Sequence, residues 1–141
     1  MNTLLCIDPQ IDFHEGGALQ VIGANANADA IAAFIDSNRA KVDRIVVTLD
    51  THHKLHIAHA AFWQGGSDPS LRPANFSVIT RSQVESGEWT PRDPSLREYA
   101  LSYVSALEAR GRFVLVVWPE HCLKGSTGHA ISPVLNGAFD R

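Results

Sequence analysis

Short runs of largely apolar residues are the clearest pattern along the chain, at 4–7, 44–49 and 113–117. Runs of this kind are typical of strands buried on both faces of a parallel sheet, and the first run is expected at the centre of that sheet. A helical pattern separates the first run from the second, so this strand–helix–strand unit predicts a right-handed parallel crossover. The pattern therefore favours an α/β fold.

Two helices are predicted from apolar residues that recur every three or four positions. The first is expected to begin near Asn25 or Asn27, which are candidate N-caps. The second is expected to have Asp93 as its N-cap and Pro94 as its first helical residue, and to be closed by Gly111. The apolar faces comprise Ala28, Ile31, Phe34 and Ile35 in the first helix, and Leu96, Ala100, Tyr103, Val104 and Leu107 in the second.

The stretch from Asp50 to about Pro94 has no strong periodicity and is punctuated by glycine and proline. We expect one domain over residues 1–141, with an insertion-like loop at about 65–111. A loop of this length is uncommon in a compact domain unless it is functional or carries small elements of its own. The run from Ser82 to Glu85 is typical of a capping box and predicts one such short helix.

Three aromatic side chains in or near this loop allow two interpretations. Phe62, Trp63 and Trp89 either pack over a binding site or against a partner, or they form a satellite core beneath the loop. The sequence leaves both open.

Composition and charge narrow the classes of function. The net charge is −3 and the isoelectric point is near 6.1, so no basic surface attracts nucleic acid. No apolar run approaches the roughly 18 residues of a membrane span, and the N-terminus lacks the features of a signal peptide. We therefore expect a cytoplasmic protein with no nucleic-acid or membrane partner. Its two cysteines, Cys6 and Cys122, do not indicate a disulfide framework.

Candidate metal ligands gather after the predicted strands. Asp50 and His52 are two positions apart just past the second strand, so both side chains face the same way if the strand geometry persists. His56 and His59 follow in the same loop, and His121 comes just after the third strand. A carboxylate with imidazoles is a normal ligand set for zinc, iron or manganese. The alternative is a polar, histidine-rich loop that binds nothing specific.

Asp8 and Cys122 are further candidates for chemistry. Asp8 directly follows the first strand, where a carboxylate is placed either for proton transfer or simply to cap the next turn. Cys122 follows a histidine, yet adjacent residues at a strand end normally point in different directions. A packed structural cysteine is therefore favoured over a Cys/His nucleophile.

Several segments in a fixed order resemble the motifs of nicotinamidases, which belong to the isochorismatase-like cysteine hydrolases. These segments are residues 7–13, 15–21, 48–57, 118–122 and 125–128. The resemblance implies a Rossmann-like parallel sheet with helices on both faces. It also implies hydrolysis of a small, pyridine-like amide through a covalent thioester.

The resemblance assigns roles to individual residues. Asp8 is implied to be the acid/base of the family's Asp-Lys-Cys triad. The implied metal ligands are Asp50, His52 and His121, with His56 near them, and zinc is the expected metal. Phe13 and Trp118 are implied to line the substrate pocket. The chain departs from the family at Thr51, where a bulky aromatic is usual, and in the unusual length of the segment between His52 and His121.

The triad lysine and nucleophilic cysteine of the family lie on strands beyond the segment that contains His121. Lys124 lies in the wrong segment to replace that lysine, and Cys122 matches a structural cysteine of the family. We therefore expect an N-terminal portion of the hydrolase domain, apparently incomplete at its C-terminus. Its expected partner is the C-terminal remainder or another copy of the chain, which would make it an oligomer. The alternative is a non-catalytic remnant or subunit that acts by association.

Overall fold

The computed structural model describes residues 1–111 and 113–141 and divides into two compact units. The first unit comprises Met1–His52 and His121–Arg141, and the second comprises His53–Glu120. Each is described by itself below. Among the described residues, no helix is both long enough and apolar enough to cross a membrane. The expectation of one domain with an insertion-like loop stays a prediction.

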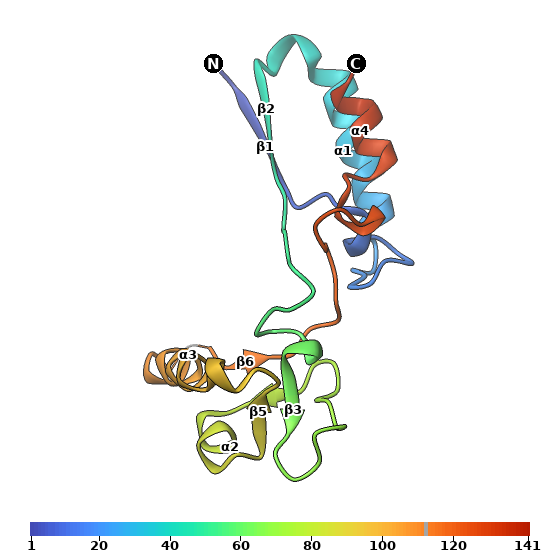
Figure 1. Cartoon of the computed structure of the whole chain (residues 1–141). Coiled ribbons are helices and arrows are strands. Elements are labelled where there is room, and N and C mark those ends of the chain that lie inside the picture. Colours follow the sequence, from blue (N-terminus) through green and yellow to red (C-terminus); the bar gives the residue numbers. More distant parts are fainter. Residues whose placement is uncertain (112) are drawn as a thin grey trace. The chain divides into compact units, whose positions relative to one another are not determined.

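The first unit is built on a parallel strand pair (Figure 1). Strand β1 (Thr3–Ile7) pairs with β2 (Arg44–Thr48) in a register that places Ile7 opposite Thr48. Helix α1 (Ala24–Asn38) connects the two strands, which confirms the predicted strand–helix–strand unit. The α/β fold class is thus confirmed.

Helices α1 and α4 (Pro133–Phe139) lie side by side and share the core of this unit (Figure 1). Leu4 of β1 and Ile45 of β2 pack against that core. Its buried members are Ala28, Ala32, Ile35, Leu135 and Ala138. The predicted apolar face of α1 is therefore correct except at Phe34, which is half exposed.

The predicted caps of α1 are wrong. The helix begins after Gly23, which has a φ of 88°, and Asn25 and Asn27 lie inside it. The carboxylate of Glu15 accepts hydrogen bonds from the backbone N–H groups of Gly23 (2.6 Å) and Asn25 (2.8 Å). Because Glu15 satisfies these N-terminal donors from the preceding loop, an asparagine cap is not needed. The same hydrogen bonds lower the pKa of the Glu15 carboxyl group.

Strand β1 is less buried than its apolar run predicts. Leu5 is 54% exposed and Ile7 is 70% exposed, whereas Cys6 between them is buried. Among the described residues, β1 pairs only with β2. The expectation that this strand is buried on both faces is therefore wrong for the chain as described, and it leaves an apolar surface along β1.

The second unit contains two short antiparallel strand pairs. Strand β3 (Trp63–Gly65) pairs with β5 (Trp89–Pro91), and β4 (Val78–Ile79) pairs with β6 (Leu115–Val116). The predicted strand at 113–117 is thus shorter than expected. Its described pairing is antiparallel with β4, so the expected place in a parallel sheet is wrong for the chain as described.

Two helices of the second unit were predicted with different accuracy. Helix α3 (Arg97–Ala109) follows a short 3₁₀ turn that Asp93 caps by accepting from the Ser95 N–H at 2.9 Å. Ala100 and Val104 are buried on its expected face, whereas Tyr103 is at its exposed margin.

Helix α2 (Arg81–Ser86) exists, but its capping box is formed by Thr80 and Gln83. The predicted box at Ser82 and Glu85 is two positions too late. Thr80 has the extended backbone that an N-cap requires, with a φ of −91° and a ψ of 157°, whereas Ser82 is already helical.

The aromatic side chains of the long loop form a core of their own. Trp63 is fully buried and Phe62 is 4% exposed, and Trp89 packs against the same cluster. The Trp63 indole donates a 2.7 Å hydrogen bond to the carbonyl of Ile57. The satellite-core interpretation is therefore the correct one. The other buried members of the cluster are Ile57, Ile79, Val84, Ala100, Val104, Leu115 and Val117.

Leu135 in α4 should be one of the most sensitive core positions of the first unit, because its side chain is 1% exposed. Leu135→Ala is expected to reduce the free energy of unfolding by about 2–5 kcal/mol, since it removes buried methyl groups and leaves a cavity. Urea unfolding followed by far-UV circular dichroism measures this change. The matched control is Val134→Ala on the same helix, where the side chain is 46% exposed. Its cost is expected to be within about 0.5 kcal/mol of zero, and equal costs for the two variants would contradict the described packing of α4.

Candidate functional site

The carboxyl ends of β1 and β2 place two carboxylates at the same edge of the first unit. Asp8 follows β1 directly, and its backbone N–H donates to the Thr48 carbonyl at 3.2 Å. The Thr48 hydroxyl in turn donates to Oδ1 of Asp8 at 2.6 Å. Asp50 lies two residues beyond the end of β2. Ligand sites in open α/β sheets are commonly built at this edge.

Asp50, His52 and His121 are brought together by the fold of the first unit. Oδ2 of Asp50 lies 3.3 Å from Nδ1 of His52 and 3.1 Å from Nε2 of His121. The two imidazole rings have a centroid separation of 4.7 Å. Each of the three residues offers one possible ligand atom, and these atoms lie within 4.8 Å of one another.

His121 reaches this position because residues 122–124 pair with His52. The His52 N–H donates to the Cys122 carbonyl at 3.0 Å, and the Lys124 N–H donates to the His52 carbonyl at 2.9 Å. These bonds form an isolated parallel bridge between His52 and Leu123. Two segments that are far apart in the sequence thus align their metal-binding side chains through the backbone.

The donor set fits a divalent transition metal. Tetrahedral zinc with ligands at about 2.0–2.2 Å separates its ligand atoms by roughly 3.3–3.6 Å. The two distances from Asp50 Oδ2 are close to this range. One carboxylate and two imidazoles leave a coordination position for water or substrate, as catalytic sites require.

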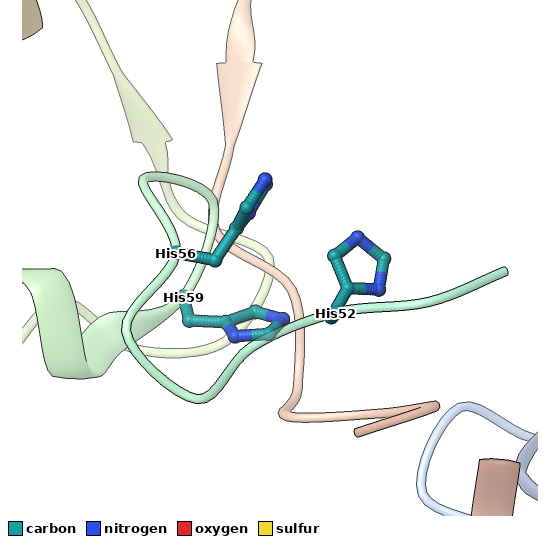
Figure 2. A group of neighbouring side chains, drawn as sticks. All are labelled: His52, His56 and His59. Atoms are coloured by element: carbon teal, nitrogen blue, oxygen red, sulfur yellow. The ribbon is translucent and has the colours of Figure 1, made fainter. Parts of the chain in front are cut away.

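Two further histidines lie on the loop that continues from His52 (Figure 2). His56 and His59 belong to the second unit, and their rings are 5.4 Å apart. His56 accepts through Nδ1 from the Ala58 N–H at 3.2 Å, and Nδ1 of His59 lies 3.2 Å from the Lys54 carbonyl. His59 is fully buried. A metal-binding role for His56 stays a prediction.

Phe13 and Trp118, the expected substrate-pocket residues, lie in different units. The Phe13 ring packs edge-on against His121, with 5.7 Å between ring centroids. Trp118 is 39% exposed and packs edge-on against Phe76 at 5.8 Å. Contact of either ring with a substrate stays a prediction.

Asp12 is a residue whose role the sequence did not reveal. Its Oδ2 accepts from the Cys122 N–H at 2.6 Å and its Oδ1 accepts from the Ala18 N–H at 3.2 Å. A Cβ atom on Gly128 would collide with the Asp12 carboxylate, so a larger residue there would displace that carboxylate. Asp12 therefore holds the segment that follows His121. Asp12 lies in the segment 7–13 that resembles a nicotinamidase motif, and this is the feature of the sequence that could have indicated its role.

Cys122 has the properties of a structural cysteine. Its side chain is fully buried. Burial first, and then the charges of Asp50, Asp12 and Asp8, raise the pKa of its thiol to about 12. A thiol in this environment is protonated at neutral pH and is a poor nucleophile.

Comparisons with known proteins identify the fold. No protein-family model and no curated protein sequence matches the chain. Among solved structures, it is similar to a nicotinamidase pyrazinamidase from Acinetobacter baumannii, with 23% identity and a TM-score of 0.58. It is also similar to the yeast nicotinamidase, with 20% identity and a TM-score of 0.60, and to that enzyme bound to the inhibitor nicotinaldehyde, with 21% identity and a TM-score of 0.62.

These similarities cover 96–99% of this chain and 46–52% of the solved structures. The chain thus spans about half the length of the proteins that it resembles. The implied Rossmann-like fold is confirmed at this level: the chain has the fold of nicotinamidases over about half of their length.

Proposed function

We propose that the chain carries the metal-binding part of a nicotinamidase-type amidohydrolase that acts on a small, pyridine-like amide. The observation that carries this proposal is the convergence of Asp50, His52 and His121 at the edge of the parallel strand pair. The resemblance to nicotinamidase structures supports the class of reaction.

The proposed roles follow from the donor types. Asp50, His52 and His121 would hold the metal, which would supply a Lewis acid and so orient the ring of the substrate. Asp8 accepts the proton of a cysteine thiol and passes it to the departing nitrogen, so that ammonia leaves and a thioester forms, which water then hydrolyses. In this proposal the cysteine and the lysine of the triad lie beyond the 141 residues.

Zinc is the metal that we expect, with iron and manganese as alternatives. His121→Ala removes one ligand, so it should lower the Zn²⁺ affinity by more than the roughly 10–100-fold that loss of a supporting partner costs. The affinity of the unmodified chain should also fall as the pH is lowered, because protons compete with the metal for the imidazole nitrogens. Competition with a chromophoric chelator measures both effects.

His53→Ala is the matched control for that experiment. His53 is an exposed histidine next to His52, and it does not belong to the group of candidate ligands formed by Asp50, His52 and His121. Its loss should leave the Zn²⁺ affinity unchanged. Equal affinity of the His121→Ala variant and the unmodified chain would contradict the proposed ligand set.

The chain alone is not expected to hydrolyse amides through Cys122. Loss of the nucleophile from a triad costs up to about six orders of magnitude in rate. Because the pKa of the Cys122 thiol is raised to about 12, little of the thiol is ionised at pH 8. The side chain is also fully buried. We expect no ammonia release from nicotinamide above background. We also expect a thiol reagent to react slowly with Cys122 in the folded chain and rapidly once the chain is unfolded.

Ammonia release from nicotinamide by the chain alone would contradict the expectation that it is inactive. Turnover of nicotinamide that disappears in Cys122→Ala would show that Cys122 is the nucleophile after all. Turnover that persists in Cys122→Ala and is lost in Asp8→Asn would keep the acid/base role but require another nucleophile within the chain.

The apolar surface of β1 supports a second part of the proposal, which is association. Leu5 and Ile7 expose 54% and 70% of their surface, and an open strand edge of this kind favours pairing with another chain. The partner would be the C-terminal remainder of the domain or another copy of this chain. The same observation favours the alternative function, a non-catalytic subunit that acts by association.

Ile7→Glu should weaken association, because it places a charge on the apolar surface of β1. Light scattering of the purified chain, alone and mixed with a C-terminal polypeptide of a nicotinamidase-type enzyme, measures the change in mass. Ile22→Glu is the matched control, since Ile22 is 92% exposed but lies outside the strands. A monomer under both conditions, or equal effects of the two variants, would contradict association through β1.

A further inference from the structure

The side chain of Gln10 is fully buried, and its amide forms two hydrogen bonds with the backbone of Asp50. Its Oε1 accepts from the Asp50 backbone N–H at 2.7 Å, and its Nε2 donates to the Asp50 carbonyl at 2.7 Å. The Gln10 amide therefore binds both the backbone N–H and the backbone carbonyl of Asp50. The carboxylate of Asp50 lies 3.3 Å from His52 and 3.1 Å from His121, the two histidines of the candidate metal site.

Asp50 needs such support because it lies beyond the last hydrogen-bonded pair of the sheet. Strand β2 ends at Thr48, which pairs with Ile7, so the strand ladder does not fix the backbone of Asp50. The Gln10 amide supplies the donor and the acceptor that a neighbouring strand would otherwise provide. It therefore holds the direction in which the Asp50 carboxylate points.

Gln10 is itself held on its other side. Nε2 also donates to the His129 carbonyl at 3.0 Å, and Gln10 forms an antiparallel bridge with Ile131. The neighbouring Ile11 N–H donates to the Ala130 carbonyl at 2.9 Å. The clamp on Asp50 is therefore tied to a separate segment of the first unit, which limits the freedom of the Gln10 side chain.

We infer that Gln10 is a positioning residue for the metal site: it acts through the backbone of Asp50 to hold the carboxylate against His52 and His121. This inference rests on the proposed metal-binding function. A purely architectural role predicts a loss of stability without any change in how the folded protein binds metal. The two roles are therefore separable by experiment.

The test uses Gln10→Met, which keeps the length of the side chain and removes both hydrogen bonds to Asp50. We expect Zn²⁺ affinity to fall about 10–100-fold, the usual effect of losing a group that orients a ligand. The visible absorption spectrum of bound Co²⁺ should also change, because it reports the geometry of the ligands. Both are measured under conditions in which circular dichroism shows the variant to be folded.

Thr51→Val is the matched control. The Thr51 hydroxyl lies 2.7 Å from Nε2 of His129, so this variant loosens the same neighbouring segment without touching the peptide groups of Asp50. It should leave the Zn²⁺ affinity and the Co²⁺ spectrum unchanged. If Thr51→Val weakens binding as much as Gln10→Met does, the effect belongs to the neighbouring segment, and the inference is overturned.

The remaining outcomes are also decisive. Unmodified affinity and an unmodified Co²⁺ spectrum in Gln10→Met would overturn the inference and leave the proposed metal site intact. No metal binding by the unmodified chain would overturn both. If Gln10→Met does not fold, hydrogen exchange of the Asp50 amide in the unmodified chain decides: strong protection supports the clamp, and exchange at the rate of an open loop refutes it.

Discussion

The parallel pairing of β1 with β2 is the constraint on which the candidate site depends. Because Ile7 lies opposite Thr48 in a parallel register, both strands end at the same edge, and the next residues leave the sheet together. Asp8 and Asp50 reach this edge for the same reason, although 42 positions separate them in the sequence. A slip of one residue would turn the side chains of one strand to the opposite face. The position of the site is therefore set by backbone pairing before any side chain makes a contact.

The same arrangement concentrates negative charge. Asp8, Asp12 and Asp50 all act on the Cys122 thiol strongly enough to raise its pKa, in addition to the effect of burial. Like charges in a partly buried region oppose one another unless a cation or hydrogen-bond donors compensate them. Asp8 and Asp12 have such donors in Thr48 and Cys122. Asp50 instead directs its carboxylate at two imidazoles, which is the environment that a divalent cation would complete.

Local patterns predicted those parts of the molecule that local forces determine. The strands at β1 and β2, the helix that Asp93 introduces, and the pairing of Asp50 with His52 follow from periodicity and cap residues. The antiparallel pairing of β6 with β4 does not, because a two-residue strand carries no pattern and its partner is chosen by the core around Trp63. Glu15 takes the place of the expected asparagine cap of α1, because it accepts hydrogen bonds from backbone N–H groups eight and ten positions later in the sequence. The role of Gln10 was hidden for the same reason, since it depends on where Asp50 and His129 lie in space.

Among the described residues other than glycine, three have a positive φ, and two of them, Asp8 and Cys122, lie beside the candidate site; the third is Phe76 in the second unit. Asp8 and Cys122 have φ values of 49° and 47°, in the left-handed region that costs a residue other than glycine roughly 1–2 kcal/mol. Strain of this kind persists only where surrounding contacts hold it. Thr48 holds Asp8 through its hydroxyl and carbonyl, and Asp12 holds the N–H of Cys122. A glycine at position 122 would relieve the strain but would leave a void where the cysteine side chain is fully buried. The left-handed turn at Cys122 follows His121 directly and leads into the residues that pair with His52, so the strained backbone is part of what places the second histidine beside the first.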